Sequence, residues 1–211
     1  MKSRKKTIAA AVCMLSIFVG SVFGSMAYLT DKQTVSNTFT VGHVKITLNE
    51  AKVDVLGVKD GNTRVEENLY HLLPGHTYIK DPTIYVDAKS EDCWLFVEVI
   101  NNIVDLETKE STKKIAAQMK SNGWIPLIGN GNIYVYQDAV KGGAVVPVFG
   151  NFIIDGSVTN DDLATLYANN KNKVNSNVGD AIQVTAYAVQ MDGFENNAQG
   201  AWSSTFGKTT P

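Results

Sequence analysis

Cysteine, histidine and an excess of one charge are all lacking in this chain of 211 residues. It carries two Cys, three His, and 19 Lys and Arg against 21 Asp and Glu. The body of the chain has no run of Lys or Arg, so the composition excludes a basic nucleic-acid binder. With 44% hydrophobic and 19% charged residues, the composition also excludes wholesale disorder. The length favours one domain with a core of its own.

The signatures of common enzyme classes are also absent. The sequence contains no H-E-x-x-H, no G-x-S-x-G, no P-loop and no dinucleotide fingerprint. His71 and His76 flank a Pro-Gly turn, but two imidazoles without a third ligand are too few for a zinc site. Asp60-Gly61-Asn62 resembles part of a calcium loop without the other ligands, so we expect a plain turn there. We therefore expect no catalytic residue, no cofactor and no metal, and a protein that is not an enzyme.

The first residues are typical of a secretory signal peptide. Four cationic residues precede the apolar stretch IAAAVCMLSIFVG, and small residues follow at the −3 and −1 positions of a cleavage site. We predict a signal peptide over residues 1–27 that is cut between Ala27 and Tyr28. The alternative is an uncleaved membrane anchor, because no charge occurs from Thr7 to Thr30.

Cleavage would change both the charge and the cysteine content. The remaining 184 residues carry 15 basic and 21 acidic side chains, a net charge of −6. Cys13 is lost with the leader, so Cys93 cannot form an internal disulfide, and the core or neighbouring molecules must hold the domain together. We expect Cys93 to be a buried core thiol. The alternative, a nucleophile, would need an acid–base partner that the sequence does not identify.

The segment after the predicted cleavage site alternates like a strand. In residues 31–41, Val35, Phe39 and Val41 share one face, with Asn37 as the polar exception. The opposite face carries Thr and Ser, so the segment has one apolar and one polar side.

The phase of this alternation changes at Gly42. Apolar positions are odd-numbered before it and even-numbered in residues 43–49. A slip of one residue exchanges the two faces of a strand, so one flat strand cannot contain both segments. We predict a hinge at Gly42 and two extended pieces that need not belong to the same sheet.

The rest of the chain also favours strands. Further strands are predicted at residues 79–88, 94–100, 133–136, 144–154 and 182–190. The 94–100 strand is expected to be covered on both faces, and Pro147 restricts its own strand to an edge or a bulged position. Helices are expected at 106–121 and at 159–169, the latter with a capping box, and the tail should be loop with a helical turn near Trp202. We predict an all-β fold, an antiparallel two-sheet jelly-roll-like sandwich with one or two inserted helices.

Four motifs together resemble a known family. They are the junction SMA/YLTD, the segment NTFTVGHVKITL, the block LPG…PTIYV…SEDCWLFV and the strand VTAYAVQMDGF. These are similar to motifs of the TasA/camelysin family of secreted Gram-positive matrix proteins, in which a SipW-type signal peptidase cuts at an A-[aromatic]-x-[TN]-D junction. The resemblance covers nearly the whole chain. His76 departs from it, because an acidic or polar residue is commoner there.

The resemblance implies a jelly-roll subunit that polymerises into fibres of a biofilm matrix, with the N-terminal segment of one subunit entering the sheet of the next. The implied partners are copies of the chain itself, a SipW-type signal peptidase and matrix co-proteins, with contact to a membrane only before cleavage. The implied location is the extracellular matrix or the cell surface. Camelysin was named as a metalloprotease, but this sequence shows no set of metal ligands that supports such an activity.

The residues favour a similar assembly by a separate argument. A lone strand that exposes Val35, Phe39 and Val41 is prone to aggregate, whereas a neighbour's groove would supply main-chain hydrogen bonds and bury these side chains. Their burial, at ~25 cal/mol per Å2, is worth roughly 4–8 kcal/mol before ordering costs. We predict a donor strand at residues 28–41 and a jelly-roll-like domain at 42–211. The alternatives are that the strand belongs to its own domain, that the protein is a secreted metalloprotease, or that it is a monomeric surface-binding module.

Overall fold

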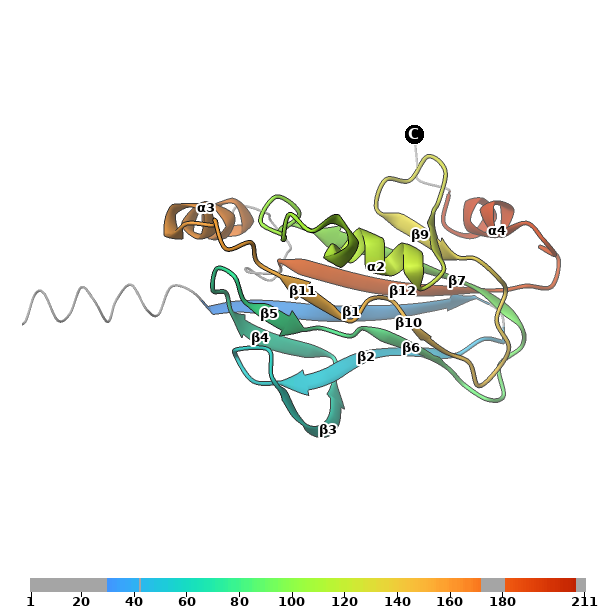
Figure 1. The fold of residues 1–211 in the computed structure, drawn as a ribbon. Coiled ribbons are helices and arrows are strands. Elements are labelled where there is room, and N and C mark those ends of the chain that lie inside the picture. The colour runs from blue at the N-terminus through green and yellow to red at the C-terminus, as the bar shows by residue number, and fades with distance from the viewer. Residues whose placement is uncertain (1–29, 42, 172–180, 208–211) are drawn as a thin grey trace, which may run out of the picture. The chain divides into compact units, whose positions relative to one another are not determined.

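The computed structural model describes residues 30–41, 43–171 and 181–207, and for residues 30–41 and 167–171 it describes the backbone only. The chain divides into two units, Met1–Thr30 and Asp31–Pro211. The fold described below is that of the second unit, in which strands dominate (Figure 1).

The secondary structure contains short strands separated by few helices. The strands are β1 (Thr30–Val41), β2 (Ile46–Val53), β3 (Lys59–Val65), β4 (Glu67–His71), β5 (Thr77–Ile79), β6 (Thr83–Val86), β7 (Cys93–Asn101), β8 (Trp124–Pro126), β9 (Ile133–Tyr136), β10 (Val145–Pro147), β11 (Asn151–Ile153) and β12 (Ile182–Gln190). The helices are η1 (Ser111–Lys113), α2 (Ile115–Ser121), α3 (Asn160–Lys171) and α4 (Ala198–Thr205).

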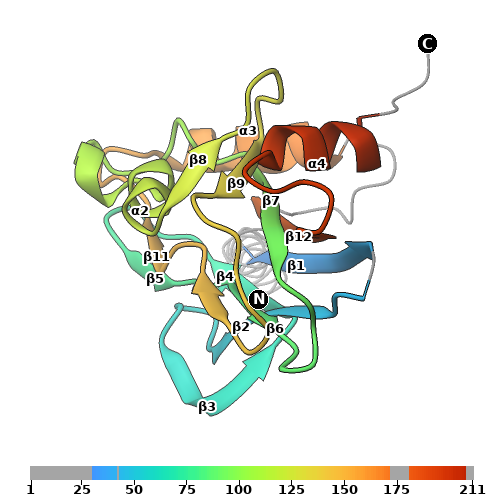
Figure 2. The same cartoon turned by 90° about the vertical axis from the view of Figure 1, so that its right-hand side faces the viewer.

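Two larger sheets form the layers of the fold. A six-stranded sheet has the order β4-β1-β12-β7-β9-β8, and a four-stranded sheet has the order β10-β6-β2-β3. In the end-on view of Figure 2, the sheets lie one above the other, and α4 covers the outer side of the six-stranded sheet. The longest pairing, β12 with β7, is antiparallel. The prediction of an all-β fold with antiparallel sheets is confirmed.

The break predicted at Gly42 coincides with a change of sheet. β1 belongs to the six-stranded sheet and β2 to the four-stranded one. Val44, Ile46 and Leu48 are each at most 5% exposed, because the even-numbered positions of this segment face the core. We predicted two extended pieces that need not belong to the same sheet, and the structure places them in different sheets. Gly42 itself lies outside the described residues.

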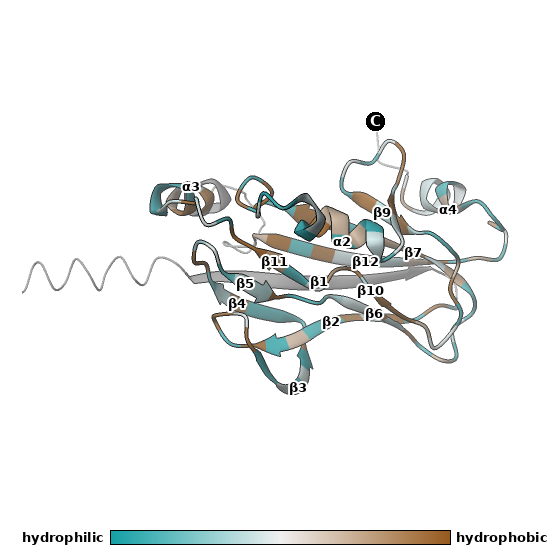
Figure 3. Cartoon of the chain, viewed as in Figure 1, coloured by the Kyte–Doolittle hydropathy of each residue, from teal (hydrophilic) through white to brown (hydrophobic). Residues whose placement is uncertain are grey.

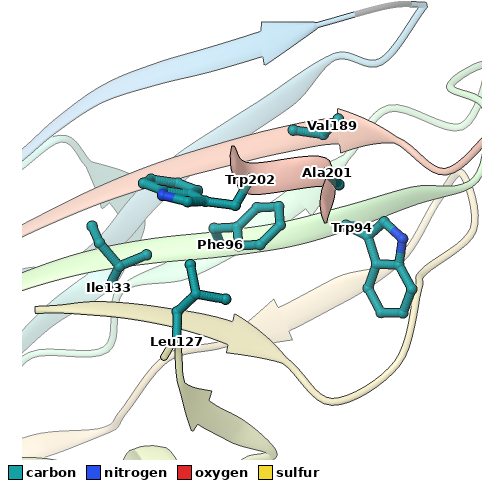
Figure 4. Packing of buried hydrophobic residues seen from close by; sticks show 7 residues of the cluster. All are labelled: Trp94, Phe96, Leu127, Ile133, Val189, Ala201 and Trp202. Atoms are coloured by element: carbon teal, nitrogen blue, oxygen red, sulfur yellow. The ribbon is translucent and has the colours of Figure 1, made fainter. Parts of the chain in front are cut away.

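The predicted central strand is also confirmed. Most side chains of β7 are buried, and β12 and β9 flank it. On its outer side, Trp94 and Phe96 pack with Trp202 of α4 in one cluster (Figure 4). Figure 3 shows hydrophobic and hydrophilic residues alternating along the neighbouring strand β12.

Two of the predicted strands are each divided into two strands in the structure, and three strands of the structure were not predicted. Residues 79–88 contain the end of β5 and all of β6, and residues 144–154 contain β10 and β11. β10, which holds Pro147, lies at the end of its sheet as predicted. The missed strands are β3, β4 and β8.

The turn expected at Asp60-Gly61-Asn62 is wrong, because these residues lie within β3. Gly61 has a φ of +71° there, and the pairing of β2 with β3 contains an irregularity. The tight turn comes earlier in the chain. It is closed by a bond from Gly57 N–H to the Asp54 carbonyl, 2.9 Å long.

The helix expected at residues 106–121 forms only over its last part. The buried carboxylate of Glu107 accepts hydrogen bonds from the Asn101 side chain and from Ile115 N–H, the latter at 2.9 Å. Lys114, with a ψ of 149°, is extended. These contacts fix the chain before Ile115 in a non-helical path, and Glu107 satisfies an N–H group at the start of α2. Ile115 and Met119 are buried as predicted.

The other two helical expectations are confirmed. Thr159 N–H donates to the Asp162 carboxylate at 2.8 Å, and Asp162 N–H donates to Thr159 Oγ1 at 3.2 Å, which is the predicted capping box with Asp in place of Glu. Leu163 of α3 is buried. The helical turn expected near Trp202 is the two-turn helix α4.

Candidate functional site

The predicted donor strand occupies an interior position of a sheet. β1 lies between β4 and β12 and runs parallel to β12 (Figure 1). A strand in this position pairs along both of its backbone edges. Without β1, both β4 and β12 would present unpaired hydrogen-bonding groups at the resulting gap. We call this position between β4 and β12 the β1 slot.

β12 forms one wall of the slot. Val184, Ala186 and Ala188 on one face of this strand are fully buried. On the other face, the Tyr187 ring packs 5.3 Å from Trp202 of α4, and its hydroxyl donates to Glu98 of β7 at 3.0 Å. Burial, followed by the nearby charge of Glu98, raises the pKa of Tyr187 to about 12. These contacts come from β7 and α4, so they do not depend on β1.

The register between β1 and β12 places the predicted donor residues. The aligned pairs are Val35 with Val184, Thr38 with Ala186, Phe39 with Tyr187, Thr40 with Ala188 and Val41 with Val189. The register shifts between Val35 and Thr38, and Asn37 falls within this irregularity. As a result, Val35 stands opposite a residue of one face of β12 and Phe39 opposite a residue of the other. The single apolar face predicted for this strand is therefore not matched to a single face of β12.

The two ends of the donor segment differ in what the structure describes. Ala27 and Tyr28, the residues of the predicted cleavage site, lie outside the described residues, as does the hinge Gly42. Directly after the hinge, Lys45 N–H donates to Ser90 Oγ at 2.9 Å. Because Val44 is also buried, the chain is anchored to the domain within three residues of the hinge.

β4 forms the other wall of the slot and is held by its side chains. Tyr70 donates its hydroxyl proton to the Ile79 carbonyl at 2.8 Å, and its ring meets Tyr78 and Phe152 edge to face at 5.8 and 5.4 Å. Burial, followed by the charges of Glu50 and Asp81, raises the pKa of Tyr70 far above its usual range.

Next to Tyr70 lies a group of buried polar side chains that the sequence reasoning missed. Glu50 of β2 is 0% exposed, Lys80 1% and Asn68 of β4 6%. Lys80 Nζ is 2.8 Å from Glu50 Oε2, and Asn68 Nδ2 donates to Glu50 Oε1 at 2.8 Å. Asn68 also bonds to the backbone of β2, donating to the Ala51 carbonyl at 2.8 Å and accepting from Val53 N–H at 2.9 Å. We call Glu50, Asn68 and Lys80 the buried triad.

The alternation of the strands contains the signal that would have found the triad. Glu50 continues the even-numbered inward series of Val44, Ile46 and Leu48, and Asn68 and Lys80 stand two residues from the buried Tyr70 and Tyr78. A charged or amide side chain at an inward position of a strand must be paired inside the protein. Three such positions therefore predict one shared polar site.

The prediction that Cys93 is a buried core thiol is confirmed. Cys93 is 0% exposed. Burial, followed by the charge of Asp92, raises the pKa of its thiol to about 12, so the protonated form predominates at neutral pH.

The ring of His76 and the backbone of His71 each contact another part of the protein. A ring nitrogen of His76 lies 2.8 Å from the Leu56 carbonyl oxygen, and its ring stacks edge to face on Tyr78. The His71 carbonyl accepts a bond from the Tyr78 hydroxyl at 2.7 Å. Over residues 30–41, 43–171 and 181–207, no group of three or more His, Cys, Asp or Glu side chains is placed to hold a metal ion.

Comparisons with known proteins identify no relative. No family model, no curated protein and no solved structure matches the chain. In the part of the chain that the structure describes, no helix combines the length and the apolar character needed to cross a membrane.

Proposed function

We propose that the mature protein is a secreted structural subunit that polymerises head to tail into extracellular fibres or a surface layer. In this assembly, β1 of each copy occupies the β1 slot of the next. The observation that supports the proposal is the position of β1, the first strand after the predicted cleavage site, inside a sheet and next to a change of sheet at Gly42. An exchanged β1 would make the same pairings as a strand folded into its own domain.

Exchange of this kind leads to an open chain of subunits. Each copy gives one strand and receives one, so the contact joins two different surfaces and does not close on itself unless the rotation permits a ring. The strand contributes main-chain hydrogen bonds on both edges, which is the recognition mode of strand addition. A jelly-roll-like sandwich completed by a strand from another copy is the fold that we infer for the assembled subunit.

Signal cleavage provides a switch for assembly. While residue 28 is attached to the apolar leader, the donor strand is tethered beside the membrane and cannot reach the slot of another copy. After cleavage by a SipW-type signal peptidase, the strand is free. We therefore infer that polymerisation begins only outside the cell, in the extracellular matrix or at the cell surface.

Mixed disulfide formation tests the exchange directly. Thr40 and Ala188 are aligned partners on adjacent strands, where Cα atoms are about 5 Å apart, within the range that a disulfide bridges. One preparation carries Thr40→Cys and the other Ala188→Cys, both with Cys93→Ala. Exchange predicts that the mixed, oxidised preparations contain disulfide-linked dimers of one copy of each variant.

A matched control uses Thr185→Cys in place of Ala188→Cys. Thr185 lies three residues away on β12, roughly 10 Å along the strand, which is beyond disulfide reach. Efficient linkage in the control would mean random collision. If the mixture forms no linked dimers, while one chain carrying both Thr40→Cys and Ala188→Cys closes an internal disulfide, β1 belongs to its own domain and the protein is a monomeric module.

A further inference from the structure

One carboxylate of the buried triad joins an amine to an amide in a site closed to water. Glu50 Oε2 is 2.8 Å from Lys80 Nζ, and Glu50 Oε1 is 2.8 Å from Asn68 Nδ2. A buried ion pair is costly to form, because both charges lose their hydration. Stability alone therefore does not explain the arrangement. An amine and an amide on the same carboxylate are the groups that a reaction between the two side chains would need.

Lys80 has the surroundings of a nucleophile. Its ammonium group has three donors, yet within the described residues Glu50 Oε2 is the one hydrogen-bond acceptor of Nζ. The Tyr70 ring lies beside it, with its centroid 6.0 Å from Nζ. Nζ and Glu50 Oε2 are in hydrogen-bond contact, so transfer of one proton between them would leave an uncharged amine and an uncharged carboxylic acid. The neutral amine then carries the lone pair that a nucleophile needs.

Asn68 has the surroundings of an electrophile. Val53 N–H donates to its Oδ1 at 2.9 Å, which polarises the carbonyl and stabilises negative charge that develops on this oxygen. Its Nδ2 donates to the Ala51 carbonyl as well as to Glu50, so the plane of the amide is fixed. Glu50, once protonated, lies beside the nitrogen that would have to leave.

We propose that Lys80 and Asn68 form an intramolecular isopeptide bond, with Glu50 as the catalytic group that carries the proton. Lys80 Nζ, after giving a proton to Glu50, attacks Asn68 Cγ, and the Nζ–Cγ bond forms. The tetrahedral intermediate collapses when Nδ2 receives protons, one of them through Glu50 and one from Nζ, and the Cγ–Nδ2 bond breaks. The nitrogen leaves as an ammonium ion, Glu50 is again a carboxylate, and the product is a secondary amide. No oxidant or other reactant is needed.

The bond would lock one wall of the β1 slot. It closes a ring from β4 to the residue after β5, and so ties β4 covalently to the end of β5. The predicted mature chain has a single cysteine, and an amide cross-link would supply covalent reinforcement without a disulfide. The proposal does not depend on the proposed function, because none of the three residues lies in β1.

Mass spectrometry of the mature wild-type protein tests the proposal. The cross-link lowers the intact mass by one ammonia, about 17 Da. It also blocks tryptic cleavage after Lys80, so residues 65–89 should appear as one peptide that lacks fragment ions between Asn68 and Lys80. Unmodified peptides 65–80 and 81–89 would overturn the proposal. A succinimide at Asn68 loses the same mass but leaves Lys80 cleavable, and that result would overturn it as well.

Two variants separate the roles. Glu50→Gln keeps the size of the side chain but cannot take up the proton, and we expect its mass to be that of the unmodified sequence. Asn68→Asp changes the leaving group, so a cross-link there would remove water, about 18 Da, in place of ammonia. Cross-linking at wild-type extent in a folded Glu50→Gln variant would refute the role of Glu50.

Discussion

Removal of β1 should leave a weakened domain that accepts the missing strand as a free peptide. In the variant lacking residues 28–40, the β1 slot is empty, because the remaining residues of the segment are too few to pair along β12. We expect this chain to be a soluble monomer that does not elongate fibres. The expectation follows from the position of β1, because β4 and β12 have no other strand beside them on the edges that face it.

The size of the effect can be worked out from the pairing. β1 and β12 share five aligned residue pairs, and at roughly 0.5–1.5 kcal/mol per backbone hydrogen bond their loss costs about 3–8 kcal/mol. A domain of this size is stable by about 5–15 kcal/mol, so the truncated chain should be near the limit of stability. At about 2–4 °C per kcal/mol, the melting temperature should fall by roughly 6–30 °C.

The assay is thermal unfolding of the truncated chain during titration with a peptide of residues 28–41. At a hundredfold excess over its Kd, the peptide should restore about 2.7 kcal/mol. The matched control is the same peptide with Phe39→Asp, which should bind more weakly. The hypothesis that β1 is a donor strand is refuted if the truncated chain forms fibres of normal morphology. It is also refuted if the wild-type peptide changes the melting temperature of the truncated chain no more than the control peptide does.

Three further predictions concern the domain itself. Gly57→Ala should lower the free energy of unfolding in urea by roughly 2–5 kcal/mol, because φ is +73° and the new Cβ would lie 2.8 Å from the Tyr78 backbone. The control Gly61→Ala has a similar φ but open space around it, and it should cost about 1 kcal/mol. Equal costs for the two variants would contradict the steric argument. Thr159→Ala should cost about 1 kcal/mol through loss of the α3 capping box, and unchanged stability would show that the cap contributes nothing. Burial raises the pKa of Cys93 to about 12 from 9.0, so between these values the folded state holds the thiol proton and the unfolded state loses it. The free energy of unfolding should therefore fall as the pH rises from about 9 to 12. In Cys93→Ala, the decrease in stability that begins near pH 9 should be absent.

The parts of the fold that the sequence predicted are those in which one side of a strand is buried. Val44, Ile46 and Leu48 alternate because their strand has a core face and a solvent face, and the same holds for β12. β3 could not be found in this way, since most of its side chains are exposed and its place is determined by pairing with β2. For the helix expected from residue 106, local propensity was overridden at Glu107. Its carboxylate bonds to Asn101 and Ile115, and its backbone forms a bridge with the distant Ile154.

The candidate site was hidden for a related physical reason. Asn68 stands where an apolar side chain would have completed the alternation of β4, so the strand and the triad were missed together. Glu50 and Lys80 break the alternation of their own segments in the same manner. Polar residues at inward positions therefore make a strand harder to predict, and these are also the positions that can form a buried polar site.

If β1 is exchanged as proposed, β4 must keep its position without it, and this requirement connects the two proposals. While the slot is empty, β4 has no neighbouring strand in its sheet, because β1 separates it from β12. It can receive a donor only if it keeps its position. The Asn68 amide holds it by imitating a strand partner, since it donates to the Ala51 carbonyl and accepts from Val53 N–H of β2. Tyr70 adds a bond to the Ile79 carbonyl. A slot fixed in this way loses little freedom when the strand enters, and such preorganisation raises affinity because less ordering is required on binding. A covalent link from Asn68 to Lys80 would replace the bond from Nδ2 to the Ala51 carbonyl with a permanent tie between β4 and the residue after β5. It would act on fibre growth through the receiving subunit and leave the donor strand unchanged.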